Sequence, residues 1–111
     1  MGLIVYTGNP KALLAALERD VADGTVQTWA RDDEGDYTHA PAQWQRKAWM
    51  RPRLKSDRLV FSIIGQKDVT MSKLIYAVYH GRFAEMLLTH FDTMFTTAVS
   101  TATRDGEDHY S

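Results

Sequence analysis

The sequence predicts a small α+β protein, a single-domain two-layer sandwich with a mostly antiparallel sheet and a long C-terminal helix. Short apolar runs with strand-like alternation and two longer segments with helical spacing of apolar residues support this fold class. A chain of 111 residues is long enough for one hydrophobic core. The expected order is β-α-β-β-β-α, with residues 1–100 forming the domain and residues 101–111 a flexible tail.

The first two elements have clear signals at their ends. Leu3–Tyr6 is an apolar, β-branched run closed by Thr7 and Gly8, which is typical of a buried strand. Asn9 can cap a helix and Pro10 suits its first position, so a helix is expected from Pro10 to about Ala22. Gly24 then provides a left-handed stop.

Three further strands are expected in the middle of the chain. The β-branched and aromatic content of 25–30 predicts one strand, and the acidic tract at 32–36 predicts a solvated hairpin or loop tip after it. Segments 46–54 and 58–64 alternate as strands do, and Pro52 favours an edge position for the first of them. In 46–54 one predicted face holds Ala48, Met50 and Leu54, and the other holds Trp49, Arg51 and Arg53.

The C-terminal third has two interpretations. One continuous helix over 72–98 gives a broad apolar face and a second apolar seam, whereas the alternative makes 74–79 a strand, Gly81 a turn and the remainder a shorter helix. We favour the continuous helix. At about 40 Å it would exceed the width of a small domain, so it must protrude or be covered. We therefore expect a homodimer, with an interface formed by the seam Leu74, Gly81, Leu88 and Phe95.

Composition excludes several classes of protein. The sequence contains no cysteine, which rules out disulfides, thiolate metal sites and cysteine nucleophiles. We find no secretory signal and no apolar run long enough to span a membrane, and we expect a cytoplasmic protein. His80 and His90 would lie about 15 Å apart on one helix, so they cannot share a metal ion. No metal and no cofactor is expected.

The strongest polar candidate is a basic-aromatic strip made of Trp49, Arg51 and Arg53, with Trp44 nearby. Such a strip can grip an anionic ligand or a protein partner, or stack on the bases of a nucleic acid. The acidic tract at 32–36 can also neutralise it. The net charge of −1 argues against a dedicated nucleic-acid binder.

A second candidate lies within the C-terminal helix. His80 could act as an acid or base beside Tyr76 and Tyr79, with Arg82 holding an anion. On a continuous helix, however, Arg82 points to a polar strip where Glu85 can pair with it. We therefore expect a dimeric, non-enzymatic binding or regulatory module, and keep two alternatives open: a small enzyme built on His80 at a subunit boundary, and an RNA or single-stranded DNA binder.

Overall fold

The computed structural model describes residues 2–102, which form an α+β fold with one antiparallel sheet and two helices, as the sequence predicts. The sheet order is β2-β3-β4-β5-β1-β6, and every neighbouring pair is antiparallel. The elements in chain order are β1 (Gly2–Tyr6), α1 (Pro10–Ala22), β2 (Trp29–Arg31), β3 (Tyr37–His39), β4 (Ala48–Leu54), β5 (Arg58–Gly65), α2 (Lys73–His90) and β6 (Thr97–Ser100).

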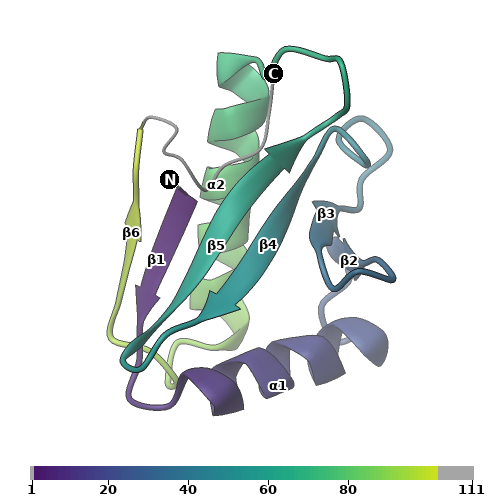
Figure 1. Ribbon diagram of the computed structural model, residues 1–111. Helices are drawn as coiled ribbons and strands as arrows, with labels where there is room; N and C mark the ends of the chain where they lie inside the picture. The colour runs from purple at the N-terminus through teal and green to yellow at the C-terminus, as the bar shows by residue number, and fades with distance from the viewer. Residues whose placement is uncertain (1, 103–111) are drawn as a thin grey trace.

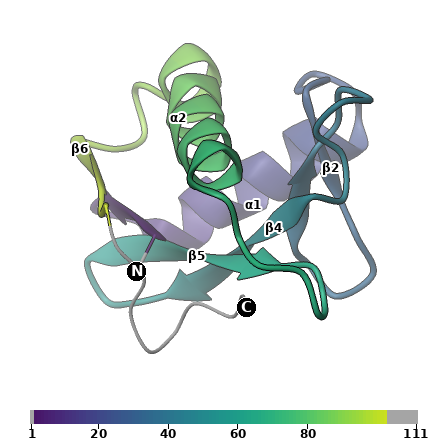
Figure 2. The same cartoon turned by 90° about the horizontal axis from the view of Figure 1, so that it is seen from above.

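Both helices lie on the same side of the sheet (Figures 1 and 2). Helix α2 runs along the strands, and α1 crosses the end of the sheet in a different direction. The core fills the space between these layers. Apolar residues that share the helix-facing side of neighbouring strands, such as Val5, Leu59 and Phe61, are fully buried under Phe83 of α2 and Leu13 of α1.

The helix starts follow local capping chemistry. The Asn9 side chain accepts a hydrogen bond from the Ala12 amide at 3.1 Å, and Ser72 accepts one from the Ile75 amide at 3.0 Å. Each side chain therefore satisfies a backbone donor that the first helical turn leaves without a partner. The predicted bounds of α1 and the left-handed conformation of Gly24, with φ of 84°, are confirmed.

The prediction of one helix over 72–98 is wrong at its C-terminal end. Helix α2 continues through Gly81, as expected, but ends at His90, and Thr97–Ser100 forms an edge strand instead. This segment contains the β-branched residues Thr97 and Val99, which have lower helix propensity. Its pairing with β1 satisfies the hydrogen-bonding groups of its backbone. An 18-residue helix measures about 27 Å, which fits molecular extents of 36 × 28 × 22 Å. The length argument for a dimer therefore no longer applies.

The middle of the sheet also differs in detail. The strand expected at 25–30 lies at Trp29–Arg31, and the acidic tract is the turn of a β2–β3 hairpin, so β3 is an additional strand. Gly35 has a φ of 86° in this turn. The edge position expected for the strand containing Pro52 is wrong, because β4 lies between β3 and β5. Pro52 is tolerated there because β3 pairs with β4 at Met50, away from the proline.

The start of the predicted tail is part of the fold. The Thr101 amide donates to the Gly2 carbonyl at 2.9 Å, and the Gly2 amide donates to Thr101 Oγ1 at 2.8 Å. These bonds extend the contact between β6 and β1 beyond Ser100. Residues 103–111 of the predicted tail lie outside the described residues.

Candidate functional site

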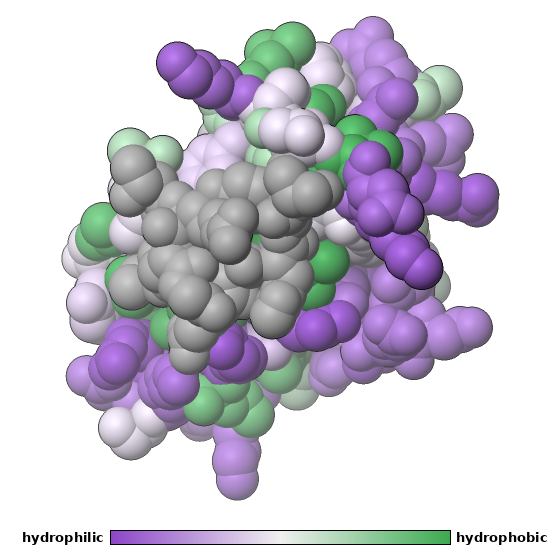
Figure 3. Space-filling model, turned by 45° about the horizontal axis from the view of Figure 1, so that its top comes forward, coloured by the Kyte–Doolittle hydropathy of each residue, from purple (hydrophilic) through white to green (hydrophobic). Residues whose placement is uncertain are grey.

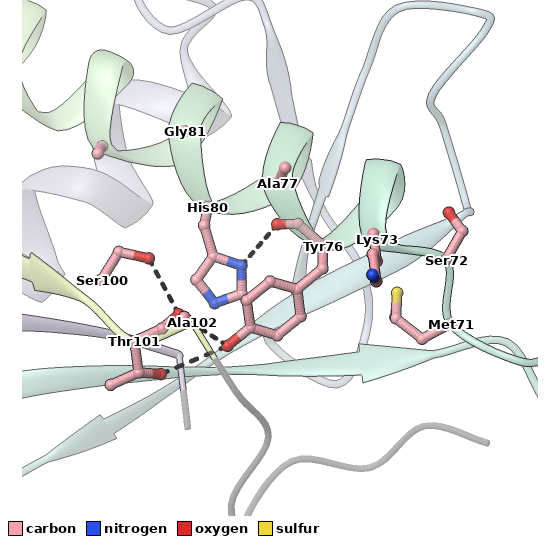
Figure 4. A pocket seen from close by; sticks show the side chains of 11 residues that line it. Met71, Ser72, Lys73, Tyr76, Ala77, His80, Gly81, Ser100, Thr101 and Ala102 are labelled. Atoms are coloured by element: carbon pink, nitrogen blue, oxygen red, sulfur yellow. Dashed lines mark hydrogen bonds between the residues drawn. The ribbon is translucent and has the colours of Figure 1, made fainter.

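A groove separates α2 from β6, with a cavity of about 610 Å³. His80 and Tyr76 project from the helix toward the chain segment that follows β6 (Figure 4). The described residues that line the cavity are Met71, Ser72, Lys73, Tyr76, Ala77, His80, Gly81, Ala84, Ser100, Thr101 and Ala102. We call this space the α2–β6 groove.

Small side chains keep the groove open. Ala77, Gly81 and Ala84 are three or four residues apart and therefore lie on one side of the helix. Across the groove, Ser100 pairs with Leu3 in the sheet and points to the helix side, as Leu3 does. Because none of these four side chains is bulky, the helix and the strand leave a space between them.

Tyr76 and His80 make a firm wall of the groove. Their rings stack with centroids 3.9 Å apart and an interplanar angle of 21°. His80 Nδ1 lies 2.8 Å from the Tyr76 carbonyl oxygen, and the Tyr76 hydroxyl donates to the Thr101 carbonyl at 3.0 Å. The wall thus ties α2 to the segment after β6, and His80 is buried with 3% of its surface exposed.

The lining has a distinct chemical character. Met71, the alanines and the two rings provide apolar surface, and Ser72, Ser100 and Thr101 provide hydroxyl groups. Lys73 contributes an ammonium group, and none of the described lining residues carries a carboxylate. Such a lining suits an apolar molecule that is neutral or carries a negative group, because no lining carboxylate repels an anion.

The cluster of Tyr79, His80 and Arg82 does not converge. Tyr79 is fully buried, and its hydroxyl donates to the Trp44 carbonyl at 2.5 Å. Arg82 lies on the outer surface and contacts Glu85 at 3.2 Å. Among the three catalytic candidates, only His80 lines the α2–β6 groove.

The basic-aromatic strip lies on the side of the sheet opposite the helices. Trp49, Arg51 and Arg53 share this face, as predicted, and all three are half-buried. On the other face Ala48 and Met50 are buried, but Leu54, which the alternation groups with them, is 46% exposed. Arg51 pairs with Asp36 of the hairpin at 2.8 Å, and Arg53 Nη2 donates to Ser62 Oγ at 2.7 Å. The strip is therefore partly neutralised by the acidic tract, the possibility that the sequence left open.

Trp44 does not belong to this strip. It lies in the loop between β3 and β4 and packs against the core cluster. Its carbonyl accepts a hydrogen bond from the Tyr79 hydroxyl, so the loop is anchored from the helix side of the sheet.

In Figure 3, hydrophilic side chains dominate the right-hand part of the molecule, where Figure 1 places β2 and β3.

The predicted dimer seam is only partly a helix surface. Leu74 and Leu88 of α2 are exposed, with 61% and 59% of their surface accessible, and Gly81 lies between them. Phe95 belongs to the segment after the helix and is partly buried against the core, so its place in the seam is a wrong prediction. Phe95 does not lie on this seam because α2 ends at His90.

His39 is a buried polar residue that sequence reasoning missed. Its ring lies 4.6 Å from the Trp29 ring, and its Nδ1 is 2.8 Å from the Thr28 carbonyl. Burial lowers the pKa of His39, partly offset by this contact with Thr28. Its alternation with Tyr37 in a short strand is the sequence signal that could have placed it in the core.

Two classes of feature are absent from residues 2–102. No group of three or more His, Asp or Glu side chains in this range is arranged to hold a metal ion. Neither α1 nor α2 has the combination of length and apolar sequence needed to cross a membrane.

Comparisons of the chain with protein-family models, with curated proteins and with solved structures find no significant match.

Proposed function

We propose that this protein is a non-enzymatic binding module and that the α2–β6 groove is its binding site. The observation that carries the proposal is the cavity of about 610 Å³, lined by small and aromatic side chains from two separate elements. Ligand sites in proteins commonly have volumes of about 300–1,000 Å³ and a mostly apolar lining with a few polar groups. The groove fits both criteria.

The lining indicates the class of ligand. An apolar body would contact Met71, Ala77 and Ala84 and lie against the Tyr76 ring. A carboxylate, sulfonate or carbonyl oxygen at one end would find hydrogen-bond donors in the ammonium of Lys73 and the nearby hydroxyls. We therefore assign the groove to an apolar molecule with an anionic or hydrogen-bond-accepting end.

Binding is favoured over catalysis by the way the polar groups of the groove are used. Acid–base catalysis needs a titratable group placed against a reacting atom, with other groups converging on it. The Tyr76 hydroxyl donates to the Thr101 carbonyl, and Arg82 lies outside the groove beside Glu85. His80 is left as part of a stacked wall, which suits positioning of an apolar ligand.

The groove is also favoured over the basic-aromatic strip. A surface that captures phosphates needs cations available for them. Arg51 makes two hydrogen bonds to Asp36 and lies 3.6 Å from Glu34, so an incoming anion would have to compete with two carboxylates. A cytoplasmic setting remains part of the proposal, because a chain without cysteine suits a reducing compartment.

The test fills the groove from the strand side. Ser100→Trp places an indole in the groove, whereas Val99→Trp places one on the opposite face of the same strand, since neighbouring strand residues alternate. The probe is 1-anilinonaphthalene-8-sulfonate, an apolar molecule with an anionic group. We expect saturable fluorescence enhancement with the wild type and Val99→Trp, and affinity at least about tenfold weaker with Ser100→Trp.

Two results would contradict this proposal. One is equal binding of the probe by both tryptophan variants, and the other is no saturable binding by the folded wild type.

A displacement experiment with carboxylates and amines tests the proposed class of ligand. Alkyl and aryl carboxylates should displace the probe at lower concentrations than amines of matched shape, because Lys73 is the charged residue among the described lining residues.

A further inference from the structure

The side of α2 that faces away from the sheet carries an apolar ridge. Leu74, Gly81 and Leu88 recur every seven residues, and at 100° per residue Tyr79 and Phe83 of the core each lie about 160° from Gly81. Leu74 and Leu88 are the most exposed of the large apolar residues described. We call these three residues the outer ridge.

The outer ridge is symmetric along the helix. Leu74 and Leu88 each lie seven residues from Gly81, which corresponds to about 10 Å on either side of it. If a second α2 lay antiparallel on the first about a twofold axis at Gly81, Leu74 of one subunit would face Leu88 of the other. A twofold interface must be self-complementary in this way, because each contact occurs twice.

Gly81 also permits close approach of the two helices. A Cβ atom added at Gly81 would meet nothing within 4 Å, so the surface at the centre of the outer ridge is open. Ala77 and Ala84 lie beside it on the groove side. Small side chains at a helix crossing let two helix axes come to the short end of the usual 8–10 Å range.

The charges at the edge of the outer ridge are compatible with the same arrangement. Arg82 contacts Glu85 of its own helix at 3.2 Å, and both side chains are more than half exposed. A twofold axis at Gly81 gathers the two pairs on one side of the crossing as a cluster of zero net charge. Each Arg82 then comes within reach of a second Glu85, which limits the repulsion between the two arginines.

We propose that a second copy of this chain packs on the outer ridge through an antiparallel α2–α2 contact centred on Gly81. This inference does not depend on ligand binding in the α2–β6 groove, although Gly81 lies at the boundary between the groove and the outer ridge. The helix face measures about 27 Å by about 11 Å, so the contact covers on the order of 300 Å² per subunit. A stable interface buries about 800 Å² per partner, and the dimer is therefore weak and dissociates on dilution.

Cysteine crosslinking tests the antiparallel geometry, because the chain contains no cysteine of its own. Leu74→Cys and Leu88→Cys are prepared separately and treated with a thiol crosslinker that reaches about 8–10 Å. In the proposed dimer, two copies of position 74 lie about 21 Å apart, and so do two copies of position 88. We expect each variant alone to crosslink poorly and their equimolar mixture to give at least about tenfold more covalent dimer.

Two results would overturn the proposal. One is equal crosslinking in the separate variants and in the mixture. The other is a wild-type protein whose light-scattering mass stays monomeric from about 10 to 500 µM, the range in which a weak dimer assembles. If the proposal holds, Leu88→Asp is monomeric throughout this range, and the control Val69→Asp, at a loop residue 47% exposed, dimerises as the wild type does.

The two proposals can fail independently. Leu88→Asp should still bind the anilinonaphthalene probe, because Leu88 does not line the groove. Val99→Trp should still dimerise, because Val99 lies on β6 and belongs neither to the groove lining nor to the outer ridge. Loss of dimer formation in Val99→Trp, in a folded protein, would contradict the placement of the interface on α2.

Discussion

Arg51 and Asp36 form a two-pronged ion pair that fastens the β2–β3 hairpin to β4. Arg51 Nε donates to Asp36 Oδ1 at 2.9 Å, and Arg51 Nη2 donates to Asp36 Oδ2 at 2.8 Å. The Asp36 residue is buried, with 4% of its surface exposed. Hydrogen bonding to Asp36 raises the pKa of Arg51 above its ordinary value.

Asp36→Asn should therefore destabilise the fold. The substitution keeps the shape of the side chain but removes its charge and one of its two acceptors for Arg51. We expect a loss of about 1–3 kcal/mol in the free energy of unfolding, measured by urea denaturation. Glu34→Gln is the matched control. Glu34 is 77% exposed and 3.6 Å from Arg51, so its loss should cost no more than about 0.5 kcal/mol.

Tyr79→Phe should loosen the loop between β3 and β4. The Tyr79 hydroxyl donates to the Trp44 carbonyl, accepts from the His39 amide at 3.4 Å and lies 3.0 Å from Thr38 Oγ1. Removing it leaves buried backbone groups without this partner, which should cost about 1–3 kcal/mol. Hydrogen exchange should show faster exchange for amides of the 40–47 loop. Unchanged protection there would contradict the anchoring role.

Tyr37→Phe is the control for that result. Tyr37 is fully buried, and among the described residues its hydroxyl has no hydrogen-bond partner. Burial raises the pKa of Tyr37 to about 12. Because the substitution removes an unsatisfied polar group, stability should stay the same or increase by up to about 1 kcal/mol.

His39 should make stability depend on pH. Its pKa is lowered by burial in the folded protein, so protonation favours the unfolded chain, where the ordinary value is 6.5. Arg82 lowers the pKa of His39 and Glu85 raises it, so these two effects oppose each other and burial remains the main cause of the shift. The contribution of His39 is fully present above about pH 6.5 and is lost as the pH falls toward the lowered pKa, by at most about 1.4 kcal/mol per pH unit.

The measurement compares the wild type with His39→Gln. Urea denaturation at about pH 7.5 and about pH 5.5 gives the pH dependence of the free energy of unfolding for each protein. The wild type should lose more stability on acidification than the variant. A variant with an undiminished pH dependence would show that other groups are responsible, whatever its absolute stability.

Gly81→Ala should stabilise the monomer. Gly81 lies in the interior of α2 and is exposed, and an added Cβ has open space around it. Alanine favours a helix over glycine by about 1 kcal/mol, so the free energy of unfolding should rise by about that amount at low protein concentration. Gly24→Ala is the opposite control. Gly24 has a φ of 84°, and alanine there should destabilise the fold.

The sequence was informative where local signals agree. In α1, Asn9, Pro10 and Gly24 mark the ends of a segment whose apolar spacing is helical, and the structure has the helix at the predicted bounds. The alternation in β4 and β5 also placed Met50, Phe61 and Ile63 in the core correctly. These features depend on residues close together in the chain.

The features that sequence reasoning missed depend on partners far away in the chain. Thr97–Ser100 becomes a strand because β1 offers an unpaired edge, and a helical spacing that includes Phe95 and Ala98 conceals this. The α2–β6 groove could not be expected without that strand. Tyr79 and His80 are adjacent in sequence but have different partners, because Tyr79 bonds to Trp44 of the 40–47 loop whereas His80 lies beside Tyr76, which bonds to Thr101.

The position of β1 between β5 and β6 has a consequence for folding during synthesis. Gly2 pairs with Ser62 on one side and bonds to Thr101, 99 residues away, on the other. Among the strands described, β1 is synthesised first, so both of its edges stay without hydrogen-bond partners until β5 and β6 follow. Nascent chains halted before residue 97 should therefore engage chaperones that bind extended apolar segments, and release should follow once β6 has emerged.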